Sequence, residues 1–398
     1  MTVAQAPALP DAGFMRLVPS PEEKAIRESV AAIAARYGHD YFMEKTRAGE
    51  PPTELWQELG KLGYLGAFLP EEYGGGQGLW SLTIVTEELA AAGCPLLPIV
   101  FSQAICGNLL ATYGTEEQKA RWLRGIGSGD IRFSFAITEA DAGSNSHGVS
   151  TRATRTPEGW VLRGQKTFIS GVENADAIVV VARTGEHAES GRGLLSLFIV
   201  DVDAPGLTRT HVPTAVQAPD QQWTLFFDDV VVGEDRLLGV AEEGLRALFS
   251  GLNPERVLGA ALSTGIGRYA LDKASRYVNE RQVWGVPIGS HQGVAHPLAE
   301  AKIELELARL MTYKAAMLYE AGSAETGEAA NMAKFAAGDA GVRCVDVAIQ
   351  VHGGNGVTIE YGLTDMWWLV RLTKIAPVSR EMVLNFVAQH SLHLPASY

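Results

Sequence analysis

The chain has 398 residues, and 33 lysines and arginines against 46 aspartates and glutamates give a formal net charge of −13. An acidic chain without a basic stripe is not expected to bind nucleic acid, and no run of about 20 uncharged apolar residues offers a membrane span. The first twenty residues lack the pattern of a targeting peptide. The length predicts two to three domains. Three cysteines, Cys94, Cys106 and Cys344, share no metal-binding spacing, so we expect them to be buried and reduced and the protein to be cytoplasmic.

Residues 1–130 are predicted to form a helical domain. The segments PEEKAIRESVAAIAARYG and LTIVTEELAAAG repeat apolar residues every three to four positions and end at glycine. Pro21, followed by Glu22 and Glu23, suits a first helical turn. The glycine-rich segment 70–78 lacks the lysine and hydroxyl residue that end a P-loop, which indicates turns instead.

Residues 131–235 are predicted to form a β domain, because short runs rich in valine, isoleucine and phenylalanine replace the helical period. The segment Thr156-Pro157-Glu158-Gly159 is typical of a type I turn, here joining two strands as a hairpin. No helices alternate with these runs, which favours an antiparallel sheet.

Residues 236–398 are predicted to form a four-helix bundle, which gives an α+β multidomain chain. The clearest helix covers 296–322. Its apolar residues are expected to share the face that packs inside the bundle, and they are Leu298, Ile303, Leu307, Leu310 and Met317.

Three further patterns point away from other functions. Gly265, Gly267 and Ala270 match a dinucleotide fingerprint, but the helical segment before them favours close helix packing instead. His390 and His393 have no acidic residue to complete a ligand set, so no metal is expected. The serines in the segment 144–146 lack the nucleophile elbow of a serine hydrolase.

A polar loop follows the first predicted strand, where Thr138, Gly143 and Ser144 could present hydroxyl and N–H groups to a ligand. Chemistry alone favours a solvated turn. The segment AITEADAGSN, however, resembles the T-E-P-x-A-G-S-D signature of the acyl-CoA dehydrogenase family, with Ala140 and Asn145 replacing the proline and the aspartate.

Three more segments resemble signatures of that family in the same order. They are GQKTFISG at 164–171 with the following Ala175-Asp176, RQVWG at 281–285 with Pro287, Ile288 and Gln292, and QVHGGNG at 350–356. Each signature is weak alone, but four in order span essentially the whole chain. The resemblance implies a helical, β and helical architecture.

The resemblance also implies FAD between the β domain and the C-terminal helices, with an acyl thioester against the flavin ring. Phe168 would pack on the ring, while Thr138 and Ser170 would hydrogen-bond its edge. Arg281 would reach the pyrophosphate of a neighbouring subunit's FAD, so the resemblance implies a homodimer or homotetramer. The implied FAD contacts are Ile137, Thr138, Gly143, Ser144, Phe168, Ile169, Ser170, Arg281, Trp284, Gln292, Gln350, Gly353, Gly354, Ser379 and Glu381.

The chain departs from the family where the catalytic base is usually found. Dehydrogenation needs a carboxylate to take the α-proton while the β-hydrogen leaves as hydride. Most members carry it in a Y-E-G-T stretch, where this chain has IAPVSRE at 375–381 and Pro377 replaces the glutamate. Proline also lacks the N–H that would polarise the thioester carbonyl, so either Val378 supplies it or the flavin does.

A substitute base is present in the segment LNPER at 252–256, which resembles the L-D-x-E-R segment of isovaleryl-CoA and long-chain members. The resemblance implies Glu255 as the catalytic base, with Ser144, Asn253 and Arg256 as substrate contacts. The alternative for Glu255 is an exposed carboxylate in the first turn of a helix that Asn253 and Pro254 open.

The expected function is FAD-dependent dehydrogenation of an acyl-CoA to the trans-2-enoyl-CoA, with electrons passed to an electron-transfer flavoprotein. A flavin-dependent oxidase or monooxygenase of the same fold stays open. So does a non-catalytic acyl- or flavin-binding subunit, which Pro377 would suggest. A dehydrogenase that acts on a carrier-protein-bound acyl group is the remaining alternative.

Overall fold

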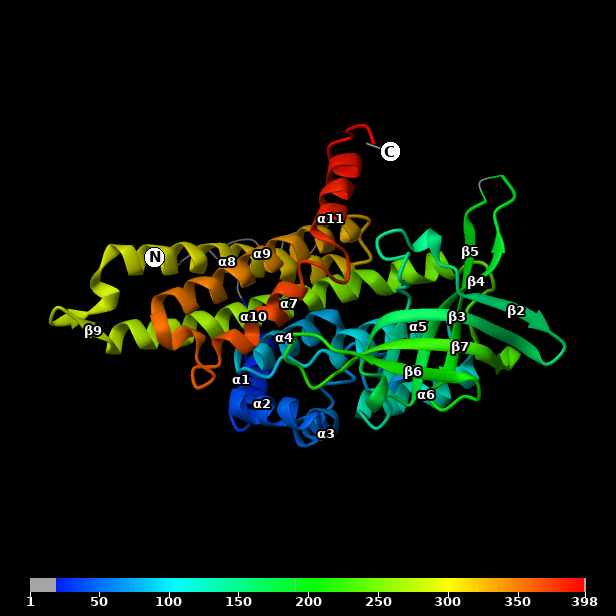
Figure 1. Ribbon diagram of the computed structural model, residues 1–398, viewed down its shortest axis with the longest axis horizontal. Helices are drawn as coiled ribbons and strands as arrows, with labels where there is room; N and C mark the ends of the chain where they lie inside the picture. Colours follow the sequence, from blue (N-terminus) through cyan, green and yellow to red (C-terminus); the bar gives the residue numbers. More distant parts are fainter. Residues whose placement is uncertain (1–18, 190, 397–398) are drawn as a thin grey trace, which may run out of the picture.

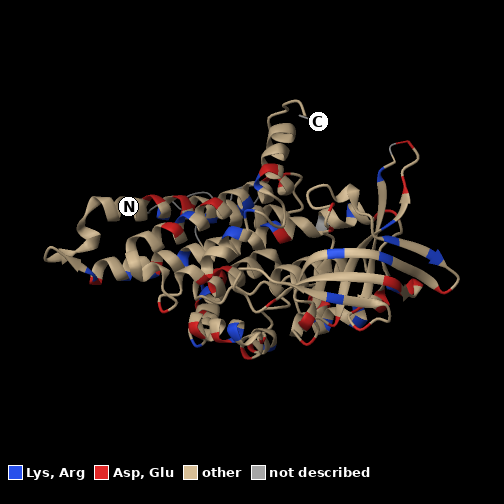
Figure 2. Ribbon diagram, viewed as in Figure 1, with Lys and Arg blue, Asp and Glu red and all other residues tan. Residues whose placement is uncertain are grey.

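The computed structural model describes residues 19–189 and 191–396, so most of the segment examined for a targeting signal lies outside the described residues. Figure 1 shows a β-sheet at one end of the molecule and long helices running away from it, with shorter N-terminal helices along their side. Acidic and basic residues are interspersed over the helices and the sheet (Figure 2). Among the described helices, none combines the length and apolarity needed to cross a membrane.

The N-terminal part is helical, as predicted. Ser20 caps the first helix by accepting a hydrogen bond from the Glu23 amide, and Pro21 occupies its first turn. The elements are α1 (Pro21–Ala34), α2 (Gly38–Ala48), α3 (Thr53–Lys61), η1 (Glu71–Tyr73), α4 (Gly78–Ala91), η2 (Ile99–Gly107), α5 (Asn108–Tyr113) and α6 (Glu116–Ser128). Nearly all of α4 is buried, because it packs on both α1 and the C-terminal helices.

The middle part is an eight-stranded sheet. Its strands are β1 (Phe133–Ala136), β2 (Arg152–Thr156), β3 (Gly159–Ser170), β4 (Ala177–Glu186), β5 (Gly193–Asp201), β6 (Leu207–Val212), β7 (Gln222–Val232) and β8 (Leu237–Leu238). They follow the order β6-β7-β3-β2-β4-β5-β8, and β1 pairs with β4. Thr156 pairs with Gly159, which confirms the predicted hairpin.

The prediction of an antiparallel sheet needs one correction. Most neighbouring strands are antiparallel, but β1 and β2 each run parallel to β4. The β2–β3 hairpin lies between β1 and β4 in the chain, and a connection of that length lets a strand return in the same direction without a crossover helix. The amino-acid composition of the strands does not show whether two of them pair in parallel or antiparallel.

The C-terminal part contains α7 (Gly244–Glu280), α8 (Gln292–Glu320), α9 (Thr326–His352), α10 (Leu363–Leu372) and α11 (Arg380–Phe386). Shorter elements join or follow them, namely β9 (Gln282–Val283), β10 (Val286–Pro287), η6 (Ile288–Ser290), η7 (Gly353–Val357) and η8 (Val387–Ser391). α7, α8 and α9 pack on one another, and α7 and α8 also pack on α4. A Cβ at Gly265 would lie 2.5 Å from that of Ala90, so the glycine allows close helix packing, as predicted.

The predicted buried face of α8 is wrong. Ile303, Leu307 and Leu310 are 61%, 62% and 46% exposed in the single chain. The buried face instead carries smaller residues, Ala301, Leu305, Ala308, Thr312, Ala315 and Ala316. α8 lies against α7 and α9, whose small residues permit close approach, so the larger aliphatic residues point outward.

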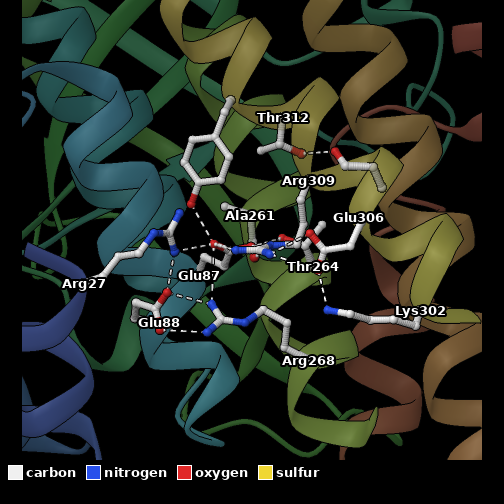
Figure 3. Close-up of polar contacts among 12 residues, drawn as sticks. Arg27, Glu87, Glu88, Ala261, Thr264, Arg268, Lys302, Glu306, Arg309 and Thr312 are labelled. Atoms are coloured by element: carbon white, nitrogen blue, oxygen red, sulfur yellow. Dashed lines mark hydrogen bonds and ion pairs between the residues drawn. The ribbon is translucent and has the colours of Figure 1, made fainter. Parts of the chain in front are cut away.

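A buried ionic network joins α1, α4, α7 and α8 (Figure 3). Glu87 and Glu88 on α4 accept from Arg27, while Arg268 pairs with Glu88 and Arg309 with Glu87. Burial acts to raise the pKa of Glu87, but the guanidinium of Arg309, followed by those of Arg268 and Arg27, holds it well below its usual range. The network ties the N-terminal helices to the bundle.

Candidate active site

A bulge in β3 turns Phe168 outward. The register between β3 and β7 shifts between Lys166 and Ile169, and Phe168 within the bulge has φ of 55°. A left-handed conformation at a bulky residue costs about 1–3 kcal/mol, and such strain is typical of binding sites. Phe168 is 60% exposed, whereas Ile169 beside it is buried. The bulge therefore presents an aromatic ring on which a planar ligand could lie.

A buried ion pair fixes the loop after β1 to this bulge. The Lys166 ammonium has no exposed surface and donates to the Ile137 carbonyl and to Glu139 Oε1, both at 2.8 Å. Burial acts to raise the pKa of Glu139, but hydrogen bonds from Lys166 and the segment 150–151 lower it to about 2. The Thr138 carbonyl accepts from the Thr167 amide at 2.9 Å. Ile137 and Thr138 are thus held beside Phe168.

Lys166 and Glu139 belong to the recognised signatures, yet the sequence did not reveal their role. The available signal was weak, because β3 also carries Arg163 and Gln165, and no local pattern marks Lys166 as the buried charge among them. A charge in such a place is stable only when it is paired. The partner, Glu139, is distant in sequence and comes into reach only because β1 and β3 end side by side.

Hydrogen bonds connect the end of β3 to η2. Gln222 Nε2 donates to Ser170 Oγ at 2.9 Å, and the Ser170 carbonyl accepts from Ser134 Oγ, also at 2.9 Å. The Ser134 carbonyl in turn accepts from Cys106 Sγ at 3.5 Å. Cys106 is buried, as predicted for all three cysteines. η2 therefore lies against the strand ends that carry the predicted flavin contacts.

Glu255 lies inside α7, about three turns after the helix begins. The alternative that Asn253 and Pro254 open a helix is therefore wrong, because Pro254 is accommodated within a longer helix. Glu255 is half-buried, and its Oε2 is buried without a hydrogen-bond partner among the described residues. Burial raises the pKa of Glu255 to about 8, against the positive charges of Arg256 and Lys334.

Glu255 lies near Cys106 on η2 and near the loop that contains Pro377. The charge of Glu255 acts on the Cys106 thiol, whose pKa is raised by burial and then by that carboxylate. One turn along α7, a Cβ at Gly259 would lie 3.9 Å from Pro377 Cδ. Because residues four apart share a helix face, Glu255 and Pro377 lie over the same side of α7. The unusual loop and the candidate substitute base are thus neighbours.

Other predicted contacts lie around this group, which we call the base cluster (Glu255, Gly259, Lys334, Pro377 and Val378). Lys334 on α9 donates to the Val378 carbonyl. The segment that follows carries Ser379, which caps α11, and the exposed Glu381. The predicted substrate contact Arg256 donates to Asn253 Oδ1 at 3.0 Å, and its buried Nε has no partner among the described residues. Gly143 and Ser144 are exposed in the loop after β1.

A second group of predicted residues lies at the far end of α7, beside the β9–β10 hairpin (Figure 1). We call it the distal cluster, and its members are Arg281, Trp284, Gln292, Gln350, Gly353 and Gly354. The Tyr277 and His352 rings stack at 4.1 Å and hold the end of α7 against the end of α9. Arg281 is exposed, and Trp284 is 87% exposed.

The two clusters cannot serve one site in a single chain. Glu255 and Arg281 are roughly 40 Å apart along α7, at about 1.5 Å per residue. One chain therefore holds the predicted base and the distal group of predicted cofactor contacts at separate places. Among the described residues, no group of histidine, cysteine, aspartate and glutamate side chains could hold a metal ion.

Comparison with known proteins accounts for the same three parts of the chain. Family models described as acyl-CoA dehydrogenase N-terminal, middle and C-terminal domains match residues 20–130, 134–230 and 242–392. Acyl-CoA dehydrogenase FadE12 of Mycobacterium tuberculosis is 52% identical over 383 residues, which cover 96% of this chain and 98% of that protein.

Solved structures share the fold. A glutaryl-coenzyme A dehydrogenase in complex with glutaryl-CoA superimposes with a TM-score of 0.91 and 29% identity, over 96% of this chain and 98% of the other. A glutaryl-CoA dehydrogenase from Mycobacterium smegmatis in complex with FADH2 gives 0.88 and 25%, over 96% and 97%. With all three domain models matched in order, the chain belongs to the acyl-CoA dehydrogenase family of oxidoreductases.

Proposed function

We propose that the chain is an FAD-dependent dehydrogenase that converts an acyl-CoA thioester to its trans-2-enoyl-CoA. The observation that carries the proposal is Glu255: one of its carboxyl oxygens is buried, with no hydrogen-bond partner in the described part of the chain, on the helix face that Pro377 covers. An unpartnered buried carboxyl is costly, and such groups are typical of functional sites. Its position beside the residue that replaces the usual glutamate supports a role as the base.

The residues around Phe168 fit a flavin. An exposed aromatic ring on a strained bulge offers a stacking face, and the loop that holds Thr138 is fixed to it by the Lys166–Glu139 pair. Ser170 lies at the end of the same strand, where its Oγ, held by Gln222, could hydrogen-bond the polar edge of a flavin ring. A relative of the same fold is described in complex with FADH2. When bound, FAD supplies the acceptor for the β-hydrogen and its electron pair.

The chain's own residues would handle the proton and the thioester. Glu255 takes the α-proton onto its carboxylate, for which a pKa of about 8 makes it a stronger base than an ordinary glutamate. Pro377 has no N–H to give to the thioester carbonyl, so we assign that contact to the Val378 amide. Arg256, on the same helix, would face the CoA portion, and an electron-transfer flavoprotein would accept the electrons.

The distal cluster supports assembly from at least two copies. Arg281 and Trp284 are exposed, and Arg281 lies roughly 40 Å along α7 from Glu255, too far to serve the same site within one chain. A neighbouring copy would bring them to its partner's FAD. The outward face of α8, with Ile303, Leu307 and Leu310, offers apolar surface for such a contact. α11, which projects from the bundle in Figure 1, offers another.

Anaerobic mixing with acyl-CoAs of different length and branching tests the proposed reaction. The purified protein should be yellow, with about one FAD per chain, and at least one acyl-CoA should bleach its flavin absorbance and yield the 2-enoyl thioester. Rapid reoxidation in air with product bound would favour the oxidase alternative. Failure of every CoA thioester, with bleaching by the matching carrier-protein thioester, would move the substrate to the carrier.

A further inference from the structure

Lys334 on α9 is a buried cation that the reaction above does not use. Only 2% of the residue is exposed, and its Nζ donates to the Val378 carbonyl. No carboxylate of the described residues lies within ion-pair distance of Nζ, although a buried ammonium is normally paired with one. Burial, followed by the charge of Arg256, lowers the pKa of Lys334 to about 8.

The charged groups that face Lys334 come from three helices. α7 supplies Glu255 and Arg256, α9 supplies Asp339, and α11 supplies Glu381. Two of the carboxylates are engaged elsewhere: Asp339 pairs with Lys374 and Arg380, and Glu381 is exposed to solvent.

That leaves one carboxylate for Lys334. Among the described residues, Glu255 has a buried oxygen without a hydrogen-bond partner, and Lys334 is a buried cation without an ion-paired carboxylate. The Glu255 charge also acts on Arg256, its neighbour on α7, and on the Cys106 thiol of η2, which stays neutral because burial raises its pKa.

We propose that Lys334 is a positioning residue for the dehydrogenation: it holds the turn at Pro377 and Val378 against α7, and its ammonium adds a second positive charge, beside that of Arg256, that faces Glu255 when the base loses its proton. The inference rests on the proposed role of Glu255. The hydrogen bond to the Val378 carbonyl fixes the residue whose N–H would contact the thioester. The charge lowers the pKa of Glu255 relative to a site without it.

Three variants separate the hydrogen bond from the charge. Lys334→Arg keeps both, Lys334→Gln keeps a donor without the charge, and Lys334→Met removes both. Lys374→Met is the matched control, because this lysine pairs with Asp339 on the neighbouring surface and does not act on Glu255.

The first readout is the pH dependence of anaerobic flavin bleaching. Loss of the positive charge should move the midpoint upward by about one pH unit in Lys334→Gln and Lys334→Met, and should slow bleaching at neutral pH by roughly 10-fold. Lys334→Arg and Lys374→Met should keep the wild-type midpoint. An unchanged midpoint in Lys334→Gln would overturn the proposal.

The second readout needs no turnover. Infrared titration of the substrate-free protein should show a carboxylic-acid band that Glu255→Gln removes, and its midpoint should rise in Lys334→Gln but not in Lys334→Arg. If the band titrated with the same midpoint in the wild type, Lys334→Gln and Lys334→Arg, the inference about Lys334 would be overturned, while Glu255 could still be the base. If Glu255→Gln bleached at the wild-type rate, the proposed base would fail instead, and the infrared midpoints would still decide whether Lys334 faces that carboxyl.

Discussion

At the scale of single residues, the site combines one strained residue with one unpartnered residue. Phe168 is held at positive φ in a bulge, and the half-buried Glu255 has a buried carboxyl oxygen and a raised pKa. Both features cost stability in a chain without ligand, and proteins retain such features where binding or chemistry needs them. Replacing either residue should therefore maintain or raise the stability of the ligand-free protein, whereas most substitutions lower it.

Glu255→Gln should raise the Tm of the substrate-free protein, by an amount that depends on pH. Burial raises the folded-state pKa of Glu255 to about 8, above that of an unfolded glutamate. Between these values the folded state holds a proton that the unfolded state has lost, so rising pH destabilises the wild type. The gain should therefore grow from about pH 5 to pH 8. Thermal unfolding checks this, with exposed Glu381→Gln as the control; equal gains at both pH values would contradict it.

Phe168→Asn should separate strain from stacking. Asparagine tolerates positive φ, so flavin-free protein should keep its stability or gain up to about 1 kcal/mol. FAD affinity should fall by roughly 3- to 10-fold, because an aromatic contact is lost. Thermal unfolding and flavin titration measure the two effects, with Phe226→Asn on β7 as the control. Unchanged affinity would mean that the ring does not contact FAD.

At the scale of elements, the Lys166–Glu139 pair joins the β1 loop to β3. Lys166→Met should destabilise the protein by about 3–5 kcal/mol, because it leaves the Glu139 carboxylate buried and unpaired. The double variant Lys166→Met with Glu139→Gln should recover part of that loss. Denaturant unfolding of both variants measures the coupling. Additive losses would show that the pair acts as two independent residues.

The sequence predicted elements better than it predicted their faces. Helices and strands follow the periods of their apolar residues, so the three-part fold was predictable. The stripe of Ile303, Leu307 and Leu310 has the same period as a core face, and only the packing of small residues on the opposite face shows that it points outward. Pro254 also misled the prediction, because proline is common in the first turn of a helix and the local sequence does not show that α7 begins earlier.

In the candidate site, the sequence likewise predicted individual residues but not the contacts between them. The signatures located Phe168, Thr138 and Glu255, because each lies in a recognisable segment. The contacts that assemble them, from Lys166 to Glu139 and from Lys334 to Val378, join positions far apart in sequence. No local pattern encodes those pairs. The limits proposed for the three domains, at 130 and 235, stay predictions.

At the scale of the whole molecule, the distance between the base cluster and the distal cluster makes a second copy part of the proposed site. Arg281→Ala should lower FAD occupancy and weaken the oligomer. Arg276→Ala should change neither, because Arg276 lies about one turn earlier and, among the described residues, forms an ion pair only with exposed Asp272. Light scattering and flavin content measure both effects. A wild type that is monomeric while it holds a full complement of FAD would contradict this assembly.

The role of Glu255 is the central claim, and anaerobic stopped-flow bleaching of the FAD-bound Glu255→Gln variant tests it most directly. The amide keeps the shape of the side chain, so FAD and acyl-CoA should still bind, while bleaching should slow by at least about 100-fold. Glu381→Gln is the matched control and should have a much smaller effect. Bleaching of Glu255→Gln at the wild-type rate, with FAD and acyl-CoA bound, would contradict the account.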